Sequence, residues 1–235
     1  MSSREISTSP GDASRSPRLA ASVHVLGSQK REAGSALASV LLVLALGLAT
    51  TAVLVLLTSA EVRLAASDRD AVEARYAAES ALDRALVDLQ AIASWDDVLS
   101  GGVGSSFGVG PPSLTVSSAT IDLEAERQAM QARTDASSAA GGNTPRWRLF
   151  GWGRLDEVLP PTVASQSPMA VAVWVADDEA EADGASEQDT NQTLWVRAVA
   201  YAGHGGRRVI EGLVMRSGPA PAPLRRLIWR EAAGG

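Results

Sequence analysis

The residues of this chain that are best suited to chemistry are acidic and lie close together. Seven carboxylates and no cation stand between Asp177 and Asp189. Carboxylate oxygens grouped beside a glycine suit Ca²⁺, which takes six to eight oxygen ligands, and Asp178, Asp183 and Asp189 are the first candidate ligands. The spacing does not match an EF-hand loop, whose acids alternate and end with a glutamate. A solvated acidic loop explains the same composition, so the sequence leaves both interpretations open.

The sequence shows no group of residues that indicates catalysis. The two histidines are His24, near the N-terminus, and His204, within a glycine-rich turn, and neither has a visible partner for acid–base chemistry. No serine stands in a nucleophile-elbow pattern, and the glycines of residues 101–110 lack the Lys-Ser/Thr of a phosphate-binding loop. The chain has no cysteine, which excludes disulfides, thiol catalysis and cysteine-ligated zinc. We therefore predict that the protein is not an enzyme and has no cofactor unless it binds calcium.

The charge of the chain is distributed unevenly. The net charge is −6, but the first 34 residues hold five basic and three acidic side chains. Residues 35–235 therefore carry 16 basic and 24 acidic side chains, a balance of −8. Because binding to nucleic-acid phosphates requires a basic surface, this composition argues against a nucleic-acid partner.

The elements that must position the acidic residues begin with a membrane span. No charged residue occurs from Ala33 to Ala60, and such a run is long enough to cross a bilayer as a helix. We predict a span over residues 35–59. Lys30 and Arg31 precede it, so the positive-inside rule places the N-terminus in the cytoplasm and the rest of the chain outside. A cleaved signal peptide is the alternative, but the apolar run exceeds a usual signal sequence and no clean cleavage site follows it.

The helical pattern continues beyond the span. Residues 61–92 contain no Gly or Pro and are rich in the helix formers Ala, Leu, Glu and Arg. One helix from Ser35 to about Ile92 is predicted, with residues 60–93 as an amphipathic half. The larger apolar side chains that would pack on a domain recur at multiples of three and four residues: Leu64, Val72, Tyr76, Leu82, Leu86 and Leu89.

Strand patterns cluster in the second half of the chain. A glycine-rich region over residues 94–145 is predicted to be mainly loop, with a short helix at 120–133. Apolar or alternating runs then predict strands at residues 146–152, 169–176, 193–201 and 207–216. The almost continuous apolar run at 169–176 is typical of a strand covered on both faces.

These patterns predict an α+β fold in which a long N-terminal helix packs on an antiparallel sheet. The sheet is expected over residues 146–217, with residues 177–189 as its acidic loop. Residues 218–235 form a proline-rich C-terminal segment, in which 224–229 could be a last strand or a docking segment. The order of the strands is not readable from the sequence.

The layout resembles the type IV pilin and pseudopilin superfamily, in which a basic leader and a glycine precede an apolar helix that leads into a globular head. The resemblance implies that prepilin peptidase cuts between Gly34 and Ser35 and removes residues 1–34, a disordered cytoplasmic leader. It also implies an anchor in the bacterial inner membrane and a periplasmic head. Two positions differ from the usual pattern. Ser35 stands where most pilins have Phe, and Ser39 stands where most have the Glu that neutralises the amino terminus of a neighbouring subunit.

A narrower resemblance lies in the second half of the predicted helix. Residues 75–86, RYAAESALDRAL, are similar to the YAAEAGLERAL signature of pilus assembly proteins with a PilX-type N-terminal region. Those proteins are minor pilins whose span likewise often lacks the Glu. The motif indicates a family and carries no chemistry of its own.

Together the resemblances imply a structural function. We expect a minor pilin-like component that enters or primes a filament. Its expected partners are other pilin subunits, prepilin peptidase, the inner-membrane assembly platform and membrane lipid. The absence of Glu at Ser39 argues against a major pilin and favours a priming or tip position. Two alternatives remain: a pseudopilin of a type II secretion system, and a bitopic envelope protein whose periplasmic domain binds a ligand or a cation.

Overall fold

The protein has the α+β fold that the sequence predicts. A computed structural model describes residues 29–108, 110–137, 143–160, 162, 167–181, 183–203 and 205–232, with side chains from Gly34 onward. The chain divides into two compact units, residues 1–60 and 61–235. Each unit is described by itself below.

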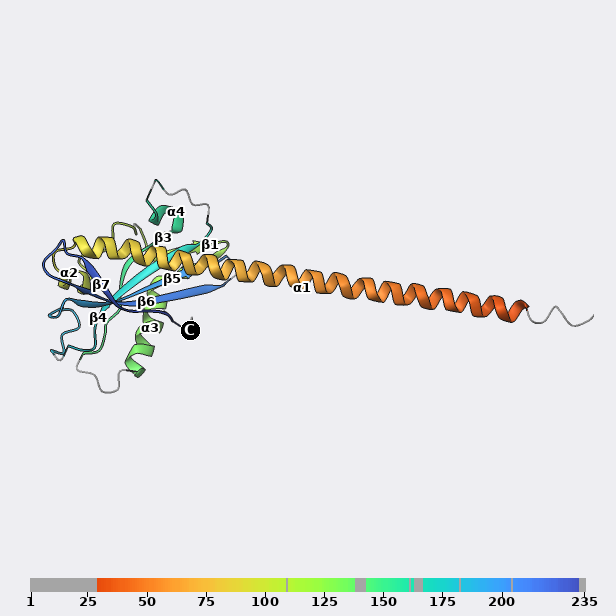
Figure 1. Ribbon diagram of the computed structural model, residues 1–235. Coiled ribbons are helices and arrows are strands. Elements are labelled where there is room, and N and C mark those ends of the chain that lie inside the picture. Colours follow the sequence, from red (N-terminus) through yellow and green to blue (C-terminus); the bar gives the residue numbers. More distant parts are fainter. Residues whose placement is uncertain are drawn as a thin grey trace, which may run out of the picture. The chain divides into compact units, whose positions relative to one another are not determined.

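The elements are drawn and labelled in Figure 1. The helices of the described residues are α1 (Gln29–Ala91), α2 (Asp96–Leu99), α3 (Leu123–Ser137) and α4 (Leu155–Val158). A small sheet pairs β1 (Ser113–Val116) with β2 (Ala119–Asp122). The larger sheet contains β3 (Arg148–Arg154), β4 (Ala170–Asp177), β5 (Thr193–Tyr201), β6 (Arg207–Arg216) and β7 (Leu224–Ala232). Its strands lie in sequence order, and every neighbouring pair is antiparallel.

In the first unit, α1 carries its apolar side chains on the outside. The large hydrophobic residues between Leu37 and Leu57 are all more than half exposed. The hydroxyls of Thr50, Thr51 and Thr58 each donate to the carbonyl oxygen four residues earlier, at 2.6 to 2.9 Å. These bonds satisfy the hydroxyl groups within an apolar segment, as a helix surrounded by lipid would require. Among the described residues, α1 is the one helix long and apolar enough to span a membrane.

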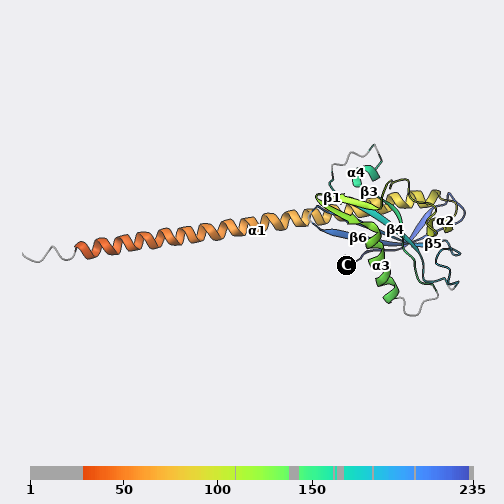
Figure 2. The ribbon, with the colours of Figure 1, turned by 180° about the vertical axis from the view of Figure 1, so that it is seen from behind.

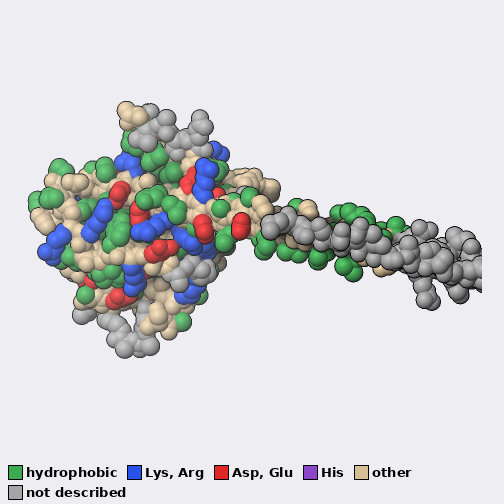
Figure 3. Space-filling view, turned by 45° about the vertical axis from the view of Figure 1, so that its right-hand side comes forward, with side chains coloured by type: hydrophobic (Ala, Val, Ile, Leu, Met, Phe, Trp, Pro, Cys, Tyr) green, Lys and Arg blue, Asp and Glu red, His purple; other side chains and the backbone are tan. Residues whose placement is uncertain are grey.

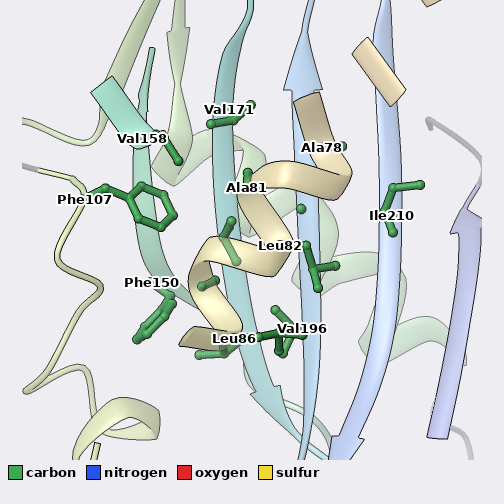
Figure 4. Close-up of a cluster of buried hydrophobic side chains, with 14 of the residues drawn as sticks. Ala78, Ala81, Leu82, Leu86, Phe107, Phe150, Val158, Val171, Val196 and Ile210 are labelled. Atoms are coloured by element: carbon green, nitrogen blue, oxygen red, sulfur yellow. The ribbon is translucent and has the colours of Figure 1, made fainter. Parts of the chain in front are cut away.

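In the second unit, the later part of α1 packs on one face of the five-stranded sheet. The buried face of the helix is largely alanine, and these residues are at most 1% exposed: Ala74, Ala77, Ala78, Ala81 and Ala85. Figure 4 shows Ala81 and Leu82 lying over the strands that carry Val171, Val196 and Ile210. Small side chains allow the helix to lie close to the sheet, and the leucines fill the remaining space at the density of a protein interior.

The opposite face of the sheet supports a second core. Alternate residues of β4 point to opposite faces, so Val171 and Val173 join the core with α1, whereas Ala172 and Trp174 join the core with α3 and β1. In Figure 1 α1 lies in front of the sheet, and in Figure 2, the view from behind, α3 and β1 lie in front of it. Every residue of β4 is buried. The prediction of a strand covered on both faces is therefore confirmed.

The C-terminal end of α1 is fixed by side chains that follow it or come from the sheet. Trp95 is buried, and its Nε1–H donates to the carbonyl oxygen of Leu89 at 3.0 Å. The Arg216 guanidinium of β6 lies 4.5 Å from the centre of the Trp95 ring and donates to the carbonyl oxygen of Ile92 at 2.6 Å. A cation at this position pairs an acceptor that the helix leaves free and complements the helix dipole. The helix is thereby joined to β6 at its last turn.

The second unit exposes many charged side chains of both signs. Figure 3 shows basic and acidic side chains interspersed over one face of it. Exposed ion pairs between the helix and the sheet include Arg226 of β7 with Asp83 of α1. A surface of mixed charge is typical of a domain that stays in water.

The structure corrects one expectation about α1. Leu64, Val72 and Tyr76 are predicted to pack on the domain, but they are 65%, 55% and 63% exposed. A helix turns by about 100° per residue, and this rotation places Val72 and Tyr76 opposite the face that Ala81 buries. The helix uses alanines and the leucines after residue 81 to reach the sheet, and the larger apolar residues before it face outward.

Other expectations about the elements have definite outcomes. The bounds predicted for β5 and β6 match those of the structure, and residues 224–229 lie in a strand, β7. The region 94–145 contains more structure than the predicted loop and short helix, because it includes the hairpin of β1 and β2. The helix predicted at 120–133 is present as α3, but it starts at Leu123, since residues 119–122 form β2.

Candidate functional site

The most distinctive polar site in the described residues is in the loop between β4 and β5. Three of its carboxylates are buried: Asp177 is 0% exposed, Asp178 4% and Glu181 5%. Each offers one carboxylate oxygen to a group in which these atoms all lie within 4.8 Å of one another. We call Asp177, Asp178 and Glu181 the acidic cluster.

The backbone of the loop positions the acidic cluster. Asp177 is the last residue of β4, so the strand itself directs its side chain. Asp178 Oδ1 accepts a hydrogen bond from Asn191 Nδ2 at 2.7 Å. Glu181 Oε1 accepts from the backbone N–H groups of Thr190 at 2.9 Å and Asn191 at 2.7 Å. These bonds join the start of the loop to its end, just before β5.

Two oxygen atoms of the acidic cluster have no hydrogen-bond partner among the described residues. Asp177 Oδ2 accepts from Asn143 Nδ2, but Asp177 Oδ1 is buried and unpaired, and so is Glu181 Oε2. Within the described part of the chain, none of the three carboxylates belongs to an ion pair. A buried carboxylate without a partner is unfavourable, and it becomes tolerable when a proton or a cation neutralises it.

The electrostatics of the loop agree with this geometry. Burial, together with the negative charge of Glu181, raises the pKa of Asp177 to about 7. Burial also raises the pKa of Asp189 to about 6, although hydrogen bonds from the N–H groups of Thr193 and Gln192 act in the opposite direction. The loop therefore concentrates negative charge where solvent does not disperse it. Such a site can hold either a proton or a cation.

Of the three ligands predicted from the sequence, one belongs to the acidic cluster and two do not. Asp178 is a member of the acidic cluster. Asp183 is exposed, and its Oδ1 accepts from the N–H of Ala185 at 3.0 Å. Asp189 lies outside the cluster of the described residues, and its Oδ1 accepts from the N–H of Thr193 at 3.2 Å.

Sequence reasoning missed Asp177 and Glu181 as members of the site. The spacing of acids within the loop does not reveal which of them are buried. One signal was available for Asp177, because it directly follows an apolar run typical of a strand covered on both faces. No comparable signal marks Glu181, whose burial follows from the path of the loop.

The acidic loop is attached to α2, the helix that follows α1. The N–H of Asp189 donates to Asp96 Oδ1 at 2.8 Å. Arg148 of β3 donates to the carbonyl oxygen of Leu99 at 2.8 Å and pairs with Glu187 at 2.5 Å. The loop conformation and the position of α2 are therefore linked by direct contacts.

The predicted processing site lies inside α1, in the first unit, because the helix begins at Gln29 and not at Ser35 as predicted. The last six residues of the predicted disordered leader, 29–34, are therefore helical. Gly34 and Ser35 are both helical, and the space where a side chain of Gly34 would begin is open. The hydroxyl of Ser39 donates to the carbonyl oxygen of Ser35 at 3.0 Å. The side chain at the position of the usual pilin Glu thus bonds to its own helix. Residues 1–28, His204 and the side chains of Lys30 and Arg31 lie outside the described part of the chain.

The combination of a long, apolar N-terminal helix with an antiparallel sheet is pilin-like in architecture. The later part of the helix forms one core with the sheet. No protein family, no curated protein and no solved structure matches this chain.

Proposed function

We propose that this protein is a minor pilin-like structural subunit that is anchored in the bacterial inner membrane and enters or primes a type IV filament. The observation that carries the proposal concerns α1. This one helix contains both the apolar, outward-facing segment and the alanine face that packs on the sheet. A domain whose span served only as an anchor would not need the same helix in its core. A filament subunit must present its head in a defined position relative to its neighbours, and it would need the anchoring helix to be part of the core of the head.

Exposed apolar residues on α1 support a role in assembly. Val72, Tyr76 and Val87 are each more than half exposed, although they belong to the second unit, where α1 packs on the sheet. At about 100° per residue these three side chains lie within about 60° of one another, on the side of the helix opposite Ala81. Exposed apolar surface on an otherwise packed helix is typical of an interface. We assign this face to contacts with other helical subunits.

The residue at position 39 favours a minor position in the filament. The resemblance to pilins implies that a Glu at this position would neutralise the amino terminus of a neighbouring subunit. Ser39 carries no charge, and its hydroxyl is bonded to Ser35. A subunit without that charge is suited to a position where it does not have to neutralise the amino terminus of a neighbouring subunit. The tip of a filament and a priming complex are such positions.

Processing of the N-terminus tests the proposal. The chain is expressed together with a prepilin peptidase, and the mature N-terminus is read by sequencing and intact mass. We expect a start at Ser35. Gly34→Leu should abolish cleavage, since a bulky side chain obstructs a site that accepts glycine, whereas Ser35→Phe, which introduces the usual pilin residue, should still be cut. A mature chain that begins at Met1 or after Ala60 would contradict the proposal.

A deletion strain separates the pilus from the secretion system. Loss of surface filaments, seen by electron microscopy, with normal export of secreted enzymes supports a minor pilin. Normal filaments with failed export would assign the protein to a type II secretion system as a pseudopilin. If both processes are normal, the protein is better described as a bitopic envelope protein.

A further inference from the structure

We infer that the acidic cluster of Asp177, Asp178 and Glu181 binds one Ca²⁺ ion, which holds the loop between β4 and β5 in place against α2. The inference goes beyond a structural role in a filament and does not depend on it. It rests on the geometry of the cluster, on the two unpaired oxygens and on the contacts of the loop.

The geometry of the cluster fits a single cation. Ca²⁺ binds oxygens at about 2.3 to 2.6 Å, so two ligands on opposite sides of the ion lie about 5 Å apart. The three carboxylate oxygens lie within 4.8 Å of one another, which allows all of them to contact one ion. Carboxylate oxygens are the ligands that Ca²⁺ prefers, and the chain has no cysteine to favour a softer metal.

The unpaired oxygens indicate a ligand independently of the number of acids. Asp177 Oδ1 and Glu181 Oε2 are buried and accept no hydrogen bond from any described residue. The other oxygen of each carboxylate is paired, Asp177 Oδ2 with Asn143 and Glu181 Oε1 with two N–H groups. Asp177 and Glu181 are thus each oriented by one oxygen and leave the other unpaired, whereas both oxygens of Asp178 accept a hydrogen bond from the loop. This arrangement is typical of ligands that are held in place before the metal binds.

A bound ion would act on more than its ligands. Glu181 accepts from Thr190 and Asn191, and the next contact along the loop joins Asp189 to Asp96 of α2. Without a cation, repulsion between the three carboxylates favours an open loop. With one, the first arm of the loop is drawn to the ion, and the hydrogen bonds of Thr190 and Asn191 to Asp178 and Glu181 keep the second arm beside it.

Equilibrium dialysis with radioactive calcium tests the assignment. The full chain is purified in a mild detergent, freed of metal with a chelator and titrated at neutral pH. We expect one ion per chain with a dissociation constant on the order of 10⁻⁴ to 10⁻³ M or tighter, as for other extracellular calcium modules. Glu181→Gln should weaken binding by about tenfold or more, because it removes a charged ligand and keeps the size of the side chain.

The loop supplies its own control. Asp183→Asn removes the same charge from the same loop at an exposed side chain, and we expect it to leave the calcium affinity unchanged. Asp177→Asn is a second test that keeps an acceptor for Asn143, so the assignment remains testable if Glu181→Gln does not fold. The absence of binding up to about 10 mM Ca²⁺, an equal effect of Asp183→Asn, or equally tight binding of Mg²⁺ would overturn the assignment.

Discussion

At the scale of single residues, Asp177 connects the fold to the candidate site. It is the last residue of a strand that is buried on both faces, and it is itself fully buried. One of its carboxylate oxygens is paired with Asn143, and the other has no partner among the described residues. Its charge state should therefore affect the stability of the second unit.

The first prediction concerns pH in the absence of metal. Burial raises the pKa of Asp177 from 3.8 to about 7. Below pH 4 the carboxyl is protonated in both the folded and the unfolded chain, so its burial does not lower the free energy of unfolding. Between pH 4 and 7 the unfolded chain releases the proton and the folded chain retains it, so the stability that the protonated carboxyl contributes is lost as pH rises.

The variant Asp177→Asn cannot titrate and so separates this effect from the rest of the protein. In excess chelator, the free energy of unfolding of Asp177→Asn relative to the original chain should increase by about 2 to 3 kcal/mol between pH 5 and pH 8. Urea denaturation followed by tryptophan fluorescence measures it. All six tryptophans lie at or beyond residue 95, so the signal reports on the second unit alone. A difference that does not change with pH would show that Asp177 titrates normally.

At the scale of elements, the alanine face of α1 determines how the helix and the sheet meet. Ala78, Ala81 and Ala85 are fully buried against the sheet, so the space beneath them is already filled. The larger side chains of the core are at Leu82 and Leu89, beside the alanines. On the exposed face of the same helix, a larger side chain would extend into solvent without displacing a neighbour.

Enlarging one alanine on each face tests this packing. Ala81→Leu should lower the free energy of unfolding by about 1 to 3 kcal/mol, because a well-packed core accepts extra methylene groups only by moving its neighbours. Ala65→Leu, on the same helix but at an exposed alanine, should change it by less than about 0.5 kcal/mol. Thermal denaturation of the full chain in detergent provides the comparison. Equal effects at both positions would show that α1 does not pack closely on the sheet.

At the scale of the whole molecule, assembly depends on the exposed face of α1. Val72, Tyr76 and Val87 are each more than half exposed in the second unit. A photo-crosslinking amino acid at Tyr76 conserves its aromatic character and reports what lies next to it in the cell. Val103, which is also exposed but follows α2, offers a matched position away from the helix.

We expect the probe at Tyr76 to form adducts with other membrane-anchored subunits, and only in strains that contain the assembly platform. The probe at Val103 should form none with them. Adducts are identified by mass and by mass spectrometry of peptides. No adduct at Tyr76, or equal yields at the two positions, would argue against the proposed interface.

The sequence predicted the fold class and most of the elements. The charge-free run from Ala33 to Ala60 and the absence of Gly and Pro from 61 to 92 indicated one long helix, and α1 ends at Ala91. The bounds of β5 and β6 were predicted correctly, because alternation and the glycine turn between them are local signals. The hairpin of β1 and β2 was missed, since its two strands have four residues each and little pattern.

The tertiary structure alone decided which face of α1 is buried and which acids form a site. The periodicity of Leu64, Val72 and Tyr76 predicted that they belong to an apolar stripe facing the sheet. Burial depends on which side chains the sheet accommodates, and these are the alanines of α1 and the leucines after residue 81. In the same way, seven nearby carboxylates predicted an acidic loop. Asp177 is buried as the last residue of β4, but only the path of the loop buries Glu181 while Asp183 stays exposed. Helix and strand propensities act between neighbours along the chain, so a sequence displays them. Burial depends on residues that are distant in sequence, and only the packed fold brings them together.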